Sequence, residues 1–200
     1  MGNLTDYIAH FDGGTKKIPL YSAYASVPDS SRDCIYWGFQ IWEQATKTPP
    51  TISSQWNIEE VDDDDANVIK EVNGFTSDYT TNNEAEYTAL IKLLEELRND
   101  STLERLWIPN IIKIKGDSKL VIQQVFGNWK VKADNLKPFN EKAKMLVTEL
   151  FYQHEIEIIA SHSPREESKQ SMVDKWARQA LINGKKVEHT NLQHQGGETI

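Results

Sequence analysis

The order of its predicted strands and helices is the feature that most constrains the fold of this chain. Three strand-like segments follow one another with no helix between them, at residues 7–15, 35–43 and 67–76. Two more, at 106–118 and 155–163, alternate with helical segments. Directly linked strands pair most easily antiparallel, whereas strands separated by helices suit parallel crossover connections. The sequence therefore predicts an α/β domain with a five-stranded mixed sheet flanked by helices.

The helices are predicted from apolar residues that recur three and four positions apart. An amphipathic helix is expected over residues 82–99, with Asn82 or Asn83 as its N-cap. A short helix is expected over 118–127, and a longer one is expected to begin near Pro138. The last helix follows the fifth strand, which completes the alternating half of the domain.

A chain of 200 residues with 38% apolar content is long enough for one domain with a substantial core. We expect this domain to span residues 1–184, with the last helix ending at Gly184, and residues 185–200 to form a polar, disordered tail. Cys34 is the only cysteine, which excludes an internal disulfide and a cysteine-based zinc site. No signal peptide or membrane-spanning run is evident, so we expect a soluble, cytoplasmic protein with no membrane partner.

The charge of the chain is unevenly distributed. The net charge is −8, which argues against a general nucleic-acid binder. Residues 113–144 nevertheless hold eight lysines against three acids. Such a basic segment on an acidic chain can steer a polyanion to one face, although lysines that solvate two ordinary helices are the alternative.

Two glutamates lie two positions apart at the start of the predicted helix 82–99. Glu86 falls in line with Leu90, Leu93 and other apolar residues of the inward stripe, so we expect it to point inward. Glu84 lies on the wetter face, where an acid in the first turn favours the helix dipole. Burial of a carboxylate is costly unless a cation or hydrogen bonds accompany it. Glu86 is therefore either a capped structural residue or a functional acid.

Two aspartates are expected at the ends of strands. Gly13 and Gly14 should stop the first strand directly after Asp12, and Asp117 should end the fourth strand. Ligands gather at the carboxyl ends of parallel strands, so the two carboxylates meet if these strands are neighbours. For either residue alone, a role in a turn or a helix cap is the alternative.

Asp174, near the start of the last helix, is the fourth candidate acid. The spacing Ser171-x-x-Asp174 also fits a capping box, which would explain this acid without a metal. Carboxylates brought together repel unless one takes up a proton or a cation binds. Mg²⁺ and Mn²⁺ prefer hard oxygen ligands, and two such ions can catalyse phosphodiester cleavage. The four acids of this predicted metal site are Asp12, Glu86, Asp117 and Asp174.

Four blocks of sequence carry a resemblance to a known family. In order, they are HFDGGTK, TNNEAEYTALI, IKIKGDSKLVIQQVFGNWKVKADNLKPFNEKAKML and SHSPREESKQSMVDKWARQAL. Together they resemble type 1 ribonuclease H, especially its compact bacterial and archaeal-like branch, over roughly residues 5–183. The resemblance implies a ribonuclease H-like fold and an endonuclease that hydrolyses the RNA strand of RNA/DNA hybrids with two Mg²⁺ ions, or Mn²⁺ in their place.

The resemblance also implies roles for individual residues. One ion would be held by Asp12, Glu86 and Asp117, and the second by Asp12 and Asp174. One ion would orient the attacking water and the other would support the departing 3′ oxygen, which leaves 5′-phosphate and 3′-hydroxyl ends. His162 matches a histidine thought to assist product release, and a plain strand-end residue is the alternative.

Substrate contacts are implied on both strands of a hybrid. Asn83 and backbone groups of Gly13 and Gly14 are the candidates for the RNA strand. The DNA strand is expected to meet the basic segment through stacking and phosphate contacts. The residues expected there are Trp129, Lys130 and Lys132. A place in the core is the alternative for Trp129.

Two other functions remain open at this point. The chain could be a 3′ to 5′ exonuclease of the same broad fold, or a catalytically inactive nucleic-acid-binding module. Residues 16–33 and 44–66 depart from the short connections of the family, which concerns the choice of substrate. We expect a monomer that uses no small-molecule organic cofactor.

Overall fold

The computed structural model describes residues 5–19, 31–45, 66–76, 81–99 and 111–194. Most of the two connections that depart from those of the family, residues 16–33 and 44–66, lies outside these ranges. No helix of the described part is long and apolar enough to cross a membrane.

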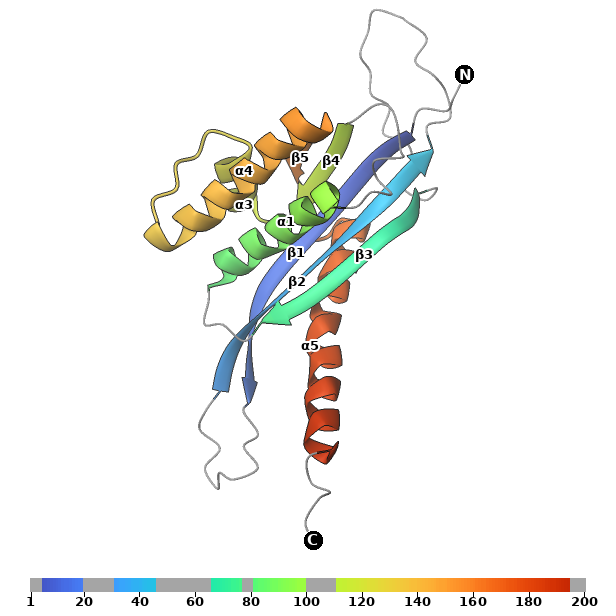
Figure 1. The fold of residues 1–200 in the computed structure, drawn as a ribbon, viewed down its shortest axis with the longest axis vertical. Helices are drawn as coiled ribbons and strands as arrows, with labels where there is room; N and C mark the ends of the chain where they lie inside the picture. Colours follow the sequence, from blue (N-terminus) through green and yellow to red (C-terminus); the bar gives the residue numbers. More distant parts are fainter. Residues whose placement is uncertain (1–4, 20–30, 46–65, 77–80, 100–110, 195–200) are drawn as a thin grey trace, which may run out of the picture.

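A five-stranded mixed sheet forms the centre of the structure, with strand order β3-β2-β1-β4-β5 (Figure 1). The first three strands are antiparallel, and β4 and β5 run parallel to β1. The predicted fold class is therefore confirmed. The strands are β1 (Thr5–Pro19), β2 (Ser31–Ala45), β3 (Ala66–Thr76), β4 (Ile111–Gly116) and β5 (Glu157–His162).

Helices cover both faces of this sheet (Figure 1). On one face, α1 and α4 pack together over the main apolar core, which includes Phe11, Leu94 and Leu146. On the other face, α5 crosses β2, where Ala177 packs closely against Gly38. The helices are α1 (Asn82–Asn99), α3 (Lys119–Val125), the 3₁₀ turn η2 (Asp134–Leu136), α4 (Lys137–His154) and α5 (Ser168–His194).

The last helix is longer at both ends than the sequence predicted. It begins at Ser168 and continues past Gly184 to His194. A glycine inside a helix costs only about 1 kcal/mol relative to alanine, and no proline follows to stop it. The expected end at Gly184 is therefore wrong, whereas residues 195–200 of the expected tail lie outside the described part of the chain.

The expectation that Gly13 and Gly14 stop the first strand is wrong. β1 continues through both glycines to Pro19. A Cβ at Gly13 would lie 2.3 Å from the carbonyl oxygen of Ala85 in α1. A Cβ at Gly14 would lie 2.4 Å from the hydroxyl of Tyr36. These glycines therefore permit close packing against neighbouring elements, a recognised use of glycine within a strand.

The contact at Gly13 gives a prediction for stability. Gly13→Ala should lower the free energy of unfolding by about 1–3 kcal/mol, because the added methyl group meets backbone that cannot move independently. Urea denaturation followed by circular dichroism measures the change. Gly127→Ala is the matched control, since its Cβ would first meet the flexible end of the Gln123 side chain. Equal losses in the two variants would contradict the proposed close contact.

Candidate functional site

Asp12 and Asp117 are brought together by the pairing of β1 with β4. Phe11 pairs with Gly116, the last residue of β4, so the two aspartates follow paired positions on neighbouring strands. The expectation that the first and fourth strands are neighbours is confirmed. Asp12 nevertheless lies within β1 and not at its end, because only β4 stops at this level of the sheet.

Glu86 reaches the same place from the first turns of α1. The close approach at Gly13 sets this part of the helix directly against β1. The side chain of Glu86 points inward as predicted, and the residue is only 3% exposed. Its Oε2 atom is buried and has no hydrogen-bond partner among the described residues.

The alternative of a helix-capping role belongs to Glu84 and not to Glu86. Thr81, immediately before α1, donates its backbone N–H to Glu84 Oε2 at 2.5 Å, and its hydroxyl donates to the same oxygen at 3.0 Å. In return the Glu84 N–H donates to the Thr81 hydroxyl at 3.4 Å, which completes a capping box. Thr81 is thus the N-cap, and the expectation of Asn82 or Asn83 is wrong because neither makes these reciprocal bonds.

Three carboxylates form a compact acidic group. Asp12, Glu86 and Asp117 each offer an oxygen, and these atoms lie within 4.8 Å of one another. Asp12 is 1% exposed, and neither of its carboxylate oxygens has a hydrogen-bond partner within the described structure. Buried acceptors without partners are rare and costly. Oxygen ligands in this arrangement fit a divalent metal ion.

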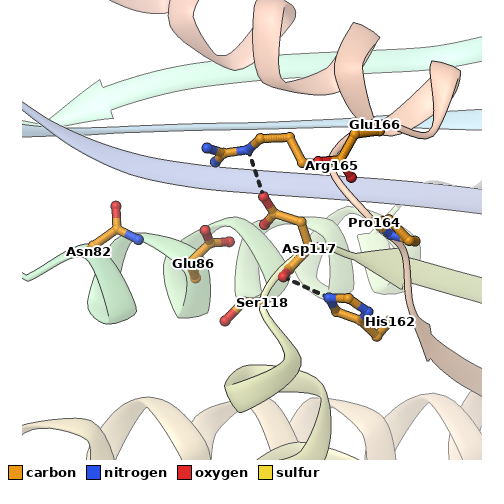
Figure 2. Close-up of a pocket in the computed structure, with 8 residues that line it drawn as sticks. All are labelled: Asn82, Glu86, Asp117, Ser118, His162, Pro164, Arg165 and Glu166. Atoms are coloured by element: carbon orange, nitrogen blue, oxygen red, sulfur yellow. Dashed lines mark hydrogen bonds and ion pairs between the residues drawn. The ribbon is translucent and has the colours of Figure 1, made fainter.

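A pocket of about 520 Å³ opens beside this group. Glu86 and Asp117 point into it from α1 and from the end of β4 (Figure 2). Asn82, Ser118 and His162 lie around them. Solvent and a substrate can therefore approach two of the three acids, while Asp12 is buried beneath.

Burial and mutual repulsion change the protonation of the inner acids. Desolvation raises the pKa of Asp12 most, followed by the charge of Asp117 and then by a side-chain hydrogen bond of the protonated form to Asp174 and the charge of Asp174, which together bring this pKa to about 8. Desolvation and the charge of Asp12 raise the pKa of Glu86 well above its ordinary value, although a backbone hydrogen bond from Gly13 opposes this. In the absence of a cation, Asp12 therefore keeps its proton at neutral pH, and burial disfavours the ionised form of Glu86 as well.

Asp174 lies nearby but outside the compact group of three. The alternative of a capping role is wrong, because α5 begins at Ser168 and the Ser171 N–H already donates to the carbonyl of Glu167, which precedes the helix. Its carboxylate instead pairs with Arg178, one turn later, whose Nε donates to both oxygens at 3.0 Å. Asp174 still acts electrostatically on Asp12, since it contributes to the raised pKa of that residue.

Two further side chains hold Asp117 from opposite sides (Figure 2). Arg165, which follows β5, donates Nε to Asp117 Oδ2 at 3.1 Å. His162 Nε2 donates to the backbone carbonyl of Asp117 at 3.1 Å. The sequence analysis missed Arg165. Its position three residues after His162, in a chain with four candidate acids, was the feature of the sequence that could have indicated an ion pair.

The residues predicted to contact an RNA strand differ in exposure. Gly13 and Gly14 are buried, and the Gly13 N–H donates to Glu86, so a contact from other backbone groups of these glycines remains a prediction. Of the two asparagines at the start of α1, Asn82 lines the pocket, whereas Asn83 is exposed and does not line it. A role of Asn83 in binding RNA remains a prediction.

The predicted DNA-binding residues lie in the connection between α3 and η2. Lys130 and Lys132 are exposed, and Trp129 is 50% exposed, so the alternative of a core tryptophan is wrong. The Trp129 N–H donates to Gln123 O at 3.1 Å, which fixes the start of this connection to the end of α3. Exposed lysines beside an exposed indole are suited to phosphate contact and stacking.

A buried polar network supports this connection from below. The Tyr87 hydroxyl, in α1, donates to Gln124 Oε1 at 2.9 Å, and Asn140 Nδ2, in α4, donates to the Tyr87 hydroxyl at 3.1 Å. Asn140 also donates to the backbone carbonyl of Gln124. Gln124 Nε2 in turn donates to the Lys130 carbonyl at 3.4 Å. The network therefore joins α1, α3 and α4 to the basic connection.

The raised pKa of Asp12 predicts how stability depends on pH in metal-free protein. Between about pH 4 and pH 8 the folded chain retains a proton on Asp12 that the unfolded chain has released. The retained proton contributes to the free energy of unfolding. This contribution is fully present below about pH 4 and is lost as the pH rises through about 8. Stability should therefore fall from pH 5 to pH 8, and Asp12→Asn should reduce the fall.

Thermal melts of metal-free protein across this pH range test the prediction. Asp134→Asn is the control, because the Asp134 side chain is 90% exposed and should leave the pH dependence as in the wild type. An identical pH dependence in wild type and Asp12→Asn would show that Asp12 does not hold the proton.

Known proteins can now be compared with this fold and site. No protein-family model matches the chain. The Bacillus subtilis (strain 168) protein YpeP, which is described as uncharacterized, is 30% identical over 120 residues, 60% of this chain and 48% of YpeP. The chain thus spans about half the length of this relative.

Solved structures of ribonucleases H resemble the whole described fold. The N-terminal ribonuclease H domain of a Mycobacterium tuberculosis protein is 21% identical, with a TM-score of 0.57, over 92% of this chain and 99% of that domain. LC11 ribonuclease H1, solved with an RNA/DNA hybrid, is 22% identical with a TM-score of 0.56, over 90% and 99% of the two chains. Ribonuclease H1 of Halobacterium salinarum is 22% identical with a TM-score of 0.52, over 89% of this chain and 98% of that chain. The chain therefore has the fold of type 1 ribonuclease H.

Proposed function

We propose that this chain is a metal-dependent endoribonuclease that hydrolyses the RNA strand of RNA/DNA hybrids and leaves 5′-phosphate and 3′-hydroxyl ends. The observation that carries the proposal is the group of Asp12, Glu86 and Asp117, whose oxygens converge within 4.8 Å beside a pocket. The fold supports the same function, because LC11 ribonuclease H1 with this fold was solved with an RNA/DNA hybrid. The chain spans about half of its Bacillus relative, so the proposal concerns this chain alone.

The donor set fits Mg²⁺ or Mn²⁺. Its oxygens are carboxylates, two of its members are almost fully buried, and three of its oxygen atoms have no hydrogen-bond partner in the described part of the chain. We assign Asp12, Glu86 and Asp117 to one ion, and Asp12 with Asp174 to a second. Such ions, when bound, activate a water and stabilise the departing oxygen of a phosphodiester.

Asp12 and Glu86 must lose their protons before they can act as metal ligands. The pKa of Asp12, raised to about 8, means that this side chain holds a proton in metal-free protein near neutral pH, and the raised pKa of Glu86 acts in the same direction. They must release these protons to become ligands, because only the ionised carboxylate binds a cation well. Affinity for the metal should therefore increase with pH up to about 8.

Arg165 and His162 position Asp117 within the pocket. Arg165 neutralises the Asp117 carboxylate through an ion pair, and its guanidinium is half-exposed, so it can also meet a phosphate that enters the pocket. His162 holds the backbone of Asp117 and is exposed to solvent. We assign product release to His162, where a proton can pass between the pocket and the solvent.

Substrate binding is assigned to two surfaces beside the acids. Asn82 at the pocket wall and the neighbouring Asn83 are available for the RNA strand, whose 2′-hydroxyls distinguish it from DNA. The exposed residues of the basic connection are available for the DNA backbone. They are Trp129, Lys130 and Lys132.

The paired glutamates of α1 provide the sharpest test of the function. Glu86→Gln should reduce cleavage of an RNA/DNA hybrid by at least roughly 100-fold, because it removes a charged ligand from the acidic group. Glu84→Gln is the matched control two positions away, and it should retain activity because Glu84 caps the helix. Labelled hybrid, single-stranded RNA and duplex DNA are incubated with each variant, with and without Mg²⁺.

The form of the substrate separates the remaining alternatives. A hybrid whose ends are blocked, or one that is circular, should still be cut in its RNA strand. Cleavage that requires a free end would favour a 3′ to 5′ exonuclease. Tight hybrid binding without any metal-dependent cleavage would instead favour an inactive binding module, and equal activity of the two glutamate variants would remove Glu86 from the site.

The basic connection gives a prediction for binding. Lys130→Ala combined with Lys132→Ala should weaken hybrid binding and reduce the slope of log affinity against log salt by about two, because fewer counterions are released. Fluorescence anisotropy at several salt concentrations, in Ca²⁺ or without metal, measures this slope. Lys144→Ala, on an exposed position of α4, is the control. An unchanged slope in the double variant would return both lysines to ordinary surface.

A further inference from the structure

Arg178 contacts both carboxylate oxygens of Asp174. Among the described residues, no cation contacts both oxygens of any of the other three acids. The Arg178 Nε atom lies 3.0 Å from both carboxylate oxygens of Asp174. The guanidinium also lies over the ring of Tyr36, 5.6 Å from the ring centre. Tyr36 packs on Gly14, two residues after Asp12, so the arginine is held at the border of the acidic group.

The other acids are differently arranged. No described cation pairs with Asp12, whose protonated form bonds to Asp174 itself, and Glu86 has one buried oxygen without a partner among the described residues. Arg165 contacts Asp117 through a single oxygen, and Asp117 still contributes a ligand atom to the compact group. Asp174 alone combines a cation on both oxygens with a position outside that group.

We propose that Arg178 competes with a divalent cation for Asp174, so that the second metal position binds its ion more weakly than the first. This inference rests on the proposed function, because it concerns the ion assigned to Asp12 and Asp174. The first position, formed by Asp12, Glu86 and Asp117, fills at low metal concentration. The second fills only when the arginine moves away.

The structure supports competition through charge and through access. Both oxygens that would face a cation already accept from Arg178, and a guanidinium at this distance repels a second positive charge. The Arg178 side chain is 52% exposed, so it can turn toward water without disturbing the buried apolar contacts of α5. A nucleic-acid phosphate is a suitable new partner for the released arginine.

Direct measurement of Mn²⁺ binding tests this proposal without any catalytic readout. The metal-free 200-residue chain is titrated with Mn²⁺, and bound ions are counted by equilibrium dialysis and by loss of the free-ion paramagnetic resonance signal. Wild type should show one tighter and one weaker site. Arg178→Met, which keeps an unbranched apolar stem beneath Tyr36, should tighten the weaker site by roughly tenfold and leave the tighter site within about twofold.

Three further variants make the result specific. Lys175→Ala removes one positive charge from an exposed position in the same turn of α5, and should change neither constant by more than about twofold. Arg178→Lys keeps the charge but loses the planar fork, and should tighten the weaker site by less than Arg178→Met does. Asp174→Asn should abolish the weaker site alone, which identifies it.

The outcomes separate this inference from the proposed function. An unchanged weaker site in Arg178→Met overturns the competition, and loss of that site in the same variant shows instead that Arg178 orients Asp174 as a ligand. Both results leave the first metal position intact. Absence of Mn²⁺ binding at the tighter site in wild type and in Asp174→Asn overturns the proposed function itself. Circular dichroism confirms that each variant is folded before titration.

Discussion

The contact between α1 and β1 at Gly13 is the constraint on which the acidic centre depends. With no Cβ at this position, the backbone of Ala85 approaches the strand closely, and the next residue, Glu86, is carried alongside Asp12. The parallel pairing of β1 with β4 then adds Asp117 from the end of its strand. Three separate elements thus meet, and the approach of α1 to β1 requires a residue without a side chain at position 13. A larger residue would separate the helix from the strand and the acids with it.

The negative charge of the acidic group is reduced in two different ways by the described residues. The outer acids, Asp117 and Asp174, each pair with an arginine. The inner acids, Asp12 and Glu86, are buried where no described side chain neutralises them, and they favour protonated forms instead. The two mechanisms have different consequences, because protons leave as the pH rises whereas an arginine must be displaced. Binding of the proposed metal ions would therefore couple to pH at the inner acids and to side-chain movement at the outer ones.

Much of this arrangement could be predicted from the sequence, and the failures share a physical cause. The order of the segments indicated the mixed sheet, and helical periodicity distinguished inward Glu86 from Glu84. Both signals are local. Gly13 was interpreted as a strand terminator, and Arg165 was overlooked, because their roles come from contacts with residues far away in the sequence. Asp174 was ambiguous for the same reason, since a capping pattern is visible in four residues whereas an approach to Asp12 is not.

The buried network of Tyr87, Gln124 and Asn140 bears on the thermodynamics of substrate binding. It ties the carbonyl of Lys130 to the helices that also carry Glu86, so the basic connection is held in place before any ligand arrives. A preorganised surface loses less conformational entropy on association than a loop that must first be ordered. The spacing between the basic connection and the acids is then set by the fold, and under the proposed function this spacing selects the width of duplex that can contact both at once.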